Sequence, residues 1–113
     1  MKKENIFLDL DATLSYYDGY KGVGVLGKPI PAMMDKVRRW LKEGHKITIF
    51  TARASNMIEV VAIKKWLKNN GLPDFPVTNI KSSHASVFYD DRAVQIVKNT
   101  GQTVEEYERY SER

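Results

Sequence analysis

A short apolar run near the N-terminus ends in two aspartates and constrains the fold more than any other feature of the chain. Ile6, Phe7 and Leu8 are followed by Asp9 and Asp11, which lie two positions apart. The run has the length of one buried strand, and buried strands rarely carry carboxylates unless their charge is compensated. In an open α/β sheet, binding crevices form at the carboxyl ends of the strands. The pair therefore indicates either a ligand or metal site at a strand end, or aspartates that only cap the next turn.

Length and composition describe one globular domain over residues 1–113. The chain is 42% hydrophobic and 28% charged, as soluble proteins commonly are. It has no cysteine, which excludes disulfides, Cys-based zinc sites and thiolate nucleophiles. The first apolar run is too short and too acidic for a signal peptide, and no stretch has the length of a membrane span. We therefore expect a cytoplasmic protein that does not bind membranes.

The net charge of +4 favours anionic partners such as nucleotides, nucleic acid or phosphorylated metabolites. The lysines and arginines are scattered, however, and a solvated basic surface explains them more simply.

Strand and helix signals alternate along the chain. Strands are expected within residues 5–10, 46–51, 75–80 and 85–89, and an irregular excursion or small hairpin at about 14–28. Helices are expected from Pro31 to Gly44, from Asn56 to Gly71, and within 104–112. This alternation predicts a three-layer, Rossmann-like α/β fold with a mostly parallel sheet and helices on both faces. Right-handed crossovers then bring the carboxyl ends of all strands to one edge.

Polar or charged side chains follow each predicted strand: Asp9 and Asp11, Thr51, Lys81, and Asp90 and Asp91. Several carboxylates around one point cannot all stay ionised without a cation, and oxygen ligands suit Mg²⁺. A metal, a lysine and a hydroxyl together form a cradle for a phosphoryl group. One carboxylate can then act as a nucleophile, and a second one can act as general acid and base.

The order of these residues resembles motifs one to four of the haloacid dehalogenase (HAD) superfamily. The resemblance spans nearly the whole chain and rests on Asp9-x-Asp11-x-Thr13, residues 47–51, Lys81 and residues 88–91. It implies a phosphatase in which Asp9 is the nucleophile and Asp11 the general acid and base. It also implies that Thr51 and Lys81 bind the phosphoryl group, and that Thr13, Ala52 and Arg53 adjoin the substrate. The implied Mg²⁺ ligands are Asp9, the backbone carbonyl of Asp11, Asp90 and Asp91.

Two details depart from larger members of the superfamily. Ala12 stands where many members have glycine, for which we expect a modest effect on the turn. The segments after the first and second motifs leave room for a small flap (about residues 14–28) and one helix, but for no cap domain. A capless site would be open to large substrates, or covered by a neighbouring subunit in a homo-oligomer.

The sequence thus favours a Mg²⁺-dependent phosphomonoesterase that works through an aspartyl-phosphate, with nucleotides or nucleic-acid ends as candidate substrates. The flap tyrosines Tyr16, Tyr17 and Tyr20 would either stack on a base or pack the flap onto the body. Gly22–Lys28 resembles a phosphate-binding loop but lacks the preceding strand that such a loop requires.

Two alternatives stay open. A catalytically silent relative would bind phosphate or a partner with the same residues. A receiver-type phospho-acceptor domain shares the residue types, but its acidic pair, phospho-acceptor, hydroxyl and lysine follow one another in a different order.

Overall fold

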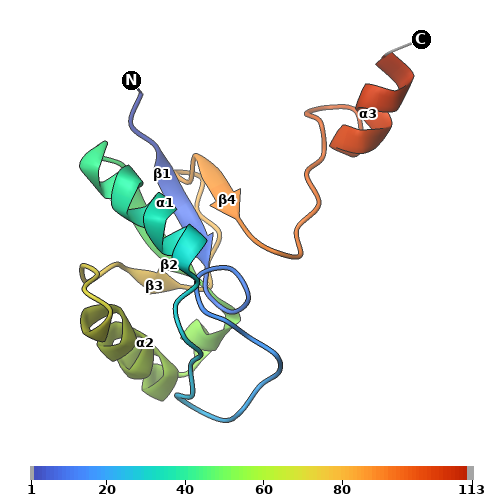
Figure 1. Cartoon of the computed structure of the whole chain (residues 1–113). Helices are drawn as coiled ribbons and strands as arrows, with labels where there is room; N and C mark the ends of the chain where they lie inside the picture. Colours follow the sequence, from blue (N-terminus) through green and yellow to red (C-terminus); the bar gives the residue numbers. More distant parts are fainter. Residues whose placement is uncertain (1, 112–113) are drawn as a thin grey trace.

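The computed structural model describes residues 2–111 and contains one parallel four-stranded sheet (Figure 1). Its strands are β1 (Asn5–Asp9), β2 (Lys46–Phe50), β3 (Val77–Thr78) and β4 (Val87–Tyr89), in the order β3-β2-β1-β4. Every pairing between neighbours is parallel, with Ile6 opposite Ile47 on one side and opposite Val87 on the other. The predicted parallel α/β architecture is therefore confirmed, although β3 and β4 are shorter than expected.

The helices also lie where the sequence placed them: α1 (Pro31–Lys42), α2 (Met57–Asn69) and α3 (Val104–Ser111), with a short 3₁₀ turn, η1 (Ala52–Ser55), before α2. Pro31 occupies the first turn of α1, and the side chain of Asn56 caps α2 by accepting a 2.8 Å hydrogen bond from the amide of Ile58. The hydroxyl of Thr103 caps α3 in the same way. Across residues 2–111, each helix is too short or too polar to cross a membrane.

The hydrophobic core lies between one face of the sheet and helices α1 and α2. Ile6 and Leu8 of β1 share this face with their partners in β2, because residues in register point to the same side. The core brings these strand residues together with side chains of both helices: Met34, Val37, Trp40, Ile63 and Leu67. Both crossover helices therefore cover the same face of the sheet.

The other face of the sheet differs from the prediction. It carries an aromatic cluster in which the rings of Phe7, Phe50 and Phe88 lie 5.5–5.7 Å apart. Helices were expected on both faces, but within residues 2–111 neither α1 nor α2 lies here, and α3 stands away from the sheet at the end of an extended arm (Figure 1). The connection between β3 and β4 spans only residues 79–86, which is too short for a crossover helix.

The turn after β1 places the first motif. The carbonyl of Leu10 accepts hydrogen bonds from the amides of Thr13, Leu14 and Ser15 at 2.9–3.2 Å. Ala12 lies in the left-handed region with φ of 68°, where glycine is the least strained residue. Glycine at this position would adopt the same turn without the strain that the Cβ of Ala12 brings.

The flap was expected at about residues 14–28; in the structure it spans residues 16–28, leaving the body and returning to it beside the same turn. Its ends are joined by a 2.8 Å hydrogen bond from the amide of Tyr16 to the carbonyl of Lys28, next to a bridge between Ser15 and Pro29. The expected small flap is thus present as a loop with a paired base.

Candidate functional site

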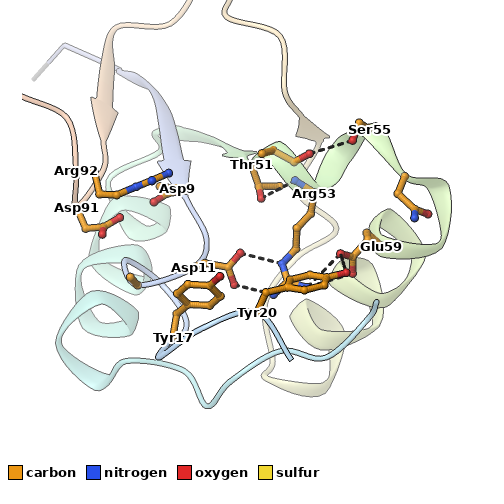
Figure 2. A pocket seen from close by; sticks show the side chains of 13 residues that line it. Asp9, Asp11, Tyr17, Tyr20, Thr51, Arg53, Ser55, Glu59, Asp91 and Arg92 are labelled. Carbon is orange, nitrogen blue, oxygen red and sulfur yellow. Dashed lines mark hydrogen bonds and ion pairs between the residues drawn. The ribbon is translucent and has the colours of Figure 1, made fainter. Parts of the chain in front are cut away.

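A pocket of about 520 Å³ opens at the carboxyl ends of β1, β2 and β4 (Figure 2). Its wall comes from three parts of the chain that are distant in sequence: the first motif and flap (Asp9, Asp11, Ala12, Tyr17, Tyr20), the segment after β2 (Thr51, Ala52, Arg53, Ser55, Asn56, Glu59), and the segment after β4 (Asp91, Arg92). The predicted gathering of strand ends at one edge is confirmed for these residues.

Three carboxylates, one half-buried and two exposed, form an acidic group at the mouth of the site. Asp9, Asp90 and Asp91 each offer an oxygen, and these oxygens all lie within 4.8 Å of one another. The buried hydroxyl of Thr13 lies 3.2 Å from Oδ2 of Asp9 and 3.3 Å from Oδ1 of Asp91, and it accepts a 3.1 Å hydrogen bond from the amide of Asp91. Thr13 therefore joins the first motif to the fourth and orients the carboxylates, whereas it was expected beside the substrate.

The acidic group has the electrostatic character of a cation site. Burial, a hydrogen bond with Asp91 and the charge of Asp90 together raise the pKa of Asp9 from 3.8 to about 7. Ligands of octahedral Mg²⁺ at about 2.1 Å lie about 3 Å apart when adjacent and about 4.2 Å apart when opposite. The three oxygens lie within 4.8 Å of one another, which is close enough for Asp9, Asp90 and Asp91 to reach one such ion after small side-chain adjustments.

Asp11 is held by a buried arginine. Nε and Nη2 of Arg53 donate to Oδ2 and Oδ1 of Asp11 at 2.8 and 3.1 Å, which is the two-pronged arrangement of a strong ion pair. The third nitrogen, Nη1, donates to both oxygens of Glu59 at 3.1 and 3.2 Å. Burial alone would lower the pKa of Arg53, but the two carboxylates raise it above its ordinary value. Both side-chain oxygens of Asp11 are therefore held in place by Arg53.

Thr51 and Ala52 follow β2 and line the pocket as expected. The side chain of Thr51 is buried, and its hydroxyl accepts a 3.2 Å hydrogen bond from the amide of Arg53, which caps η1. This cap turns the chain so that Arg53 faces Asp11 (Figure 2).

Lys81 is not part of the pocket wall. Its side chain is exposed, and its ammonium group lies 5.3 Å from the centre of the Phe88 ring, against the aromatic face of the sheet. Arg92 supplies a cation instead, because it lines this pocket and a neighbouring one that also contains Asp9. Sequence order pointed to Lys81, whereas Arg92 directly follows the acidic pair Asp90 and Asp91.

Glu59 is the residue that sequence reasoning missed. Its spacing from Asn56 predicts a capping box, in which a glutamate folds back to the start of the helix. Asn56 does cap the helix, but the carboxylate of Glu59 is 4% exposed and binds Arg53, the amide of Gly24 and the hydroxyl of Tyr20. Burial alone would raise the pKa of Glu59, but the Gly24 amide and Arg53 lower it.

Comparison with solved structures finds a conserved protein of Bacteroides thetaiotaomicron with the same arrangement of the chain. The two share 21% sequence identity and a TM-score of 0.64, over 82% of this chain and 79% of that chain. This likeness supports the α/β fold. No family model and no curated protein matches the sequence.

Proposed function

We propose that the protein is a Mg²⁺-dependent phosphomonoesterase of the HAD type, in which Asp9 forms an aspartyl-phosphate. The observation that carries this proposal is the convergence of Asp9, Asp90 and Asp91 within 4.8 Å at the mouth of a pocket that also contains Asp11 and Thr51. These are the residues for which the sequence resemblance implies catalytic and metal-binding roles.

The reaction would proceed in two steps at Asp9. A carboxylate oxygen of Asp9 attacks phosphorus, and the bond from phosphorus to the leaving oxygen breaks as Asp11 donates a proton to that oxygen. Water then attacks the phosphorus of the aspartyl-phosphate, Asp11 takes the proton from this water, and the bond to Asp9 breaks to release inorganic phosphate. Through its two hydrogen bonds, Arg53 would position Asp11 for both proton transfers.

A divalent cation is part of the proposal because of the charge in the site. Among the described residues, five carboxylates (Asp9, Asp11, Glu59, Asp90 and Asp91) gather here with the guanidinium groups of Arg53 and Arg92, while Lys36 lies beside Asp90 and Asp91. A phosphate dianion would be repelled by this surplus. Asp9, Asp90, Asp91 and the carbonyl of Asp11 would hold Mg²⁺, which supplies positive charge to the phosphoryl oxygens when bound.

Arg92 is the cation that we assign to the phosphate in place of Lys81. The guanidinium nitrogens of Arg53 already donate to Asp11 and Glu59. Arg92 instead lies beside Asp9 and Asp91 at the mouth of the pocket (Figure 2). A guanidinium group suits phosphate because its donors match two phosphate oxygens at once.

The test measures phosphate release from p-nitrophenyl phosphate with Mg²⁺ and with a chelator. We expect activity only with Mg²⁺, and a loss of kcat of at least about 1,000-fold in Asp9→Asn, because the amide is not a nucleophile. Arg92→Gln should raise KM about 10-fold or more, and Lys81→Gln should change it less than threefold.

The matched control is Asp35→Asn, which removes an exposed carboxylate that pairs with Arg38 on α1, away from the site. It should leave kcat and KM unchanged. Activity in Asp9→Asn equal to that of the parent protein, or equal activity with the chelator, would contradict the proposal.

A further inference from the structure

We propose that the pocket takes a nucleoside monophosphate, whose planar base lies against Tyr17 and Tyr20 of the flap, and that Glu59 is the positioning residue that holds this aromatic wall in place. The inference rests on the proposed phosphomonoesterase function and names the substrate class of the same site.

The wall consists of two tyrosines that the flap brings to the same pocket as the acidic group. Tyr17 and Tyr20 both line the pocket and remain 39% and 57% exposed. Exposed rings beside a phosphate site are suited to stack on a planar base, and one such stack contributes about 1–3 kcal/mol to binding. The rings therefore offer binding energy that only a substrate with a planar group can use.

Tyr20 is fixed in place by contacts on two sides. Its hydroxyl lies 3.3 Å from Oε2 of Glu59, and the guanidinium carbon of Arg53 lies 5.2 Å from the centre of its ring. A ring that is already ordered loses little conformational entropy when a ligand binds, so it is a better platform than a free surface tyrosine.

Glu59 also anchors the rest of the flap. Its Oε1 accepts a hydrogen bond from the amide of Gly24, while the indole of Trp66 on the same helix donates a 2.9 Å hydrogen bond to the carbonyl of Gly27. Glu59 itself is buried and needs these partners, since a buried carboxylate without them is strongly destabilising. The position of the flap is thereby coupled to α2.

The size and layout of the pocket suit a mononucleotide. A volume of about 520 Å³ lies within the range of about 300–1,000 Å³ that is usual for small-ligand sites. Figure 2 shows Asp9, Asp91 and Arg92 on one side of the pocket and Tyr17 and Tyr20 on the flap side, with Asp11 and Arg53 between them. A phosphate at the acidic end would leave a base on the same ligand beside the tyrosines.

The experiment compares adenosine 5′-monophosphate with ribose 5-phosphate, which differ by the base alone. For the parent protein with Mg²⁺, we expect KM to be about 10-fold lower for the nucleotide, as one stacked base would provide. Tyr17→Leu should reduce this ratio to about threefold or less, whereas Tyr17→Phe should keep it because the ring remains.

Glu59→Gln tests the positioning role. It should raise KM for the nucleotide more than KM for ribose 5-phosphate, because the ion pair with Arg53 and the support of Tyr20 are weakened together. Tyr20→Phe keeps the ring and removes only the hydroxyl that meets Glu59, so it provides the same test without a buried change. Asp74→Asn, which breaks an exposed ion pair with Lys64 of α2, should leave both KM values unchanged.

Equal KM values for the two substrates in the parent protein would overturn this inference and leave the proposed phosphatase function in place. So would a Tyr17→Leu variant that shifts both KM values by the same factor. Release of phosphate from neither substrate nor p-nitrophenyl phosphate would overturn the proposed function, and the inference with it.

Discussion

Without a bound cation, the ionised carboxylate of Asp9 destabilises the folded protein. Its pKa is raised to about 7 in the folded protein from 3.8, the ordinary value that we assume for the unfolded chain. Between these two values the folded protein binds more protons than the unfolded chain, so the contribution of Asp9 to stability falls as pH rises from about 4 to 7. The full shift corresponds to about 4 kcal/mol, of which solvent screening of a partly exposed group leaves about 1–2 kcal/mol.

Asp9→Asn should therefore stabilise the metal-free protein at about pH 8, with a melting temperature about 4 °C or more above that of the parent protein. At about pH 4 the difference should disappear, because Asp9 is then protonated in the parent protein. Mg²⁺ should raise the melting temperature of the parent protein at about pH 8 and have a much smaller effect on the variant. Thermal melts in a chelator and in Mg²⁺ measure all three effects. A variant that is less stable than the parent protein at about pH 8 would contradict this account of Asp9.

At the scale of elements, the flap depends on one close backbone approach at its base. A Cβ at Gly27 would lie 1.9 Å from the carbonyl oxygen of Tyr16, which is a backbone atom that cannot rotate away. Gly27→Ala should therefore push the two ends of the flap apart and weaken the nearby hydrogen bond between Tyr16 and Lys28. We expect a loss of stability of about 1–3 kcal/mol, as for other overpacking substitutions, and a higher KM for a nucleotide substrate.

Gly19→Ala is the matched control within the same flap. A Cβ at Gly19 meets nothing within 4 Å, although its φ of 130° strains any larger residue. It should cost about 1 kcal/mol of stability through strain alone and change KM less than Gly27→Ala does. Denaturant unfolding and KM are measured on the parent protein and on both variants. The comparison separates the effect of backbone strain at Gly19 from that of the steric clash at Gly27. Equal effects of the two substitutions would show that the flap base tolerates a Cβ at residue 27.

The elements of the fold were predictable where the signal is local. The continuous apolar run of β1, the proline at the start of α1 and the Asn56 cap of α2 each depend on only a few neighbouring residues. The gathering of Asp9 with Asp90 and Asp91 also followed, because parallel topology brings strand ends together. The left-handed turn at Ala12 has no signal in the neighbouring residues. Only the resemblance, in which glycine takes this position, indicated it.

The rest of the site depends on contacts between distant segments, which no local pattern encodes. Glu59 has the spacing of a capping residue, but its carboxylate accepts hydrogen bonds from Arg53 and from the amide of Gly24 instead. Lys81 lies in the right order along the chain, but the short β3–β4 connection leaves its ammonium over Phe88. In both cases the direction of the side chain is set by residues that are distant in the sequence, so sequence order alone does not predict it.

At the scale of the whole molecule, the chain is more elongated than a single compact domain of its length. Its radius of gyration is 15.7 Å and its longest dimension 50 Å, whereas a compact chain of this length would have a radius of gyration of about 13 Å. The difference comes from the arm that carries α3 away from the sheet (Figure 1). Two of the hydrogen bonds in the arm join residues of the arm itself, Val97 with Gln102 and Val104 with Gln95.

Removal of the arm should consequently have little effect on the body. A chain that ends after Val94 keeps Arg92 and the entire pocket, and it retains every residue of the hydrophobic core. We expect its melting temperature to lie within about 3 °C of that of the full chain, and its radius of gyration to fall to about 12 Å in small-angle scattering. Leu67→Ala in the full chain is the contrasting variant, because a cavity in the core should cost about 2–5 kcal/mol. If the shortened chain instead melts about 10 °C lower, the arm must pack against the body in solution. The aromatic face with Phe7, Phe50 and Phe88 would then be the surface that it covers, since α1 and α2 occupy the opposite face.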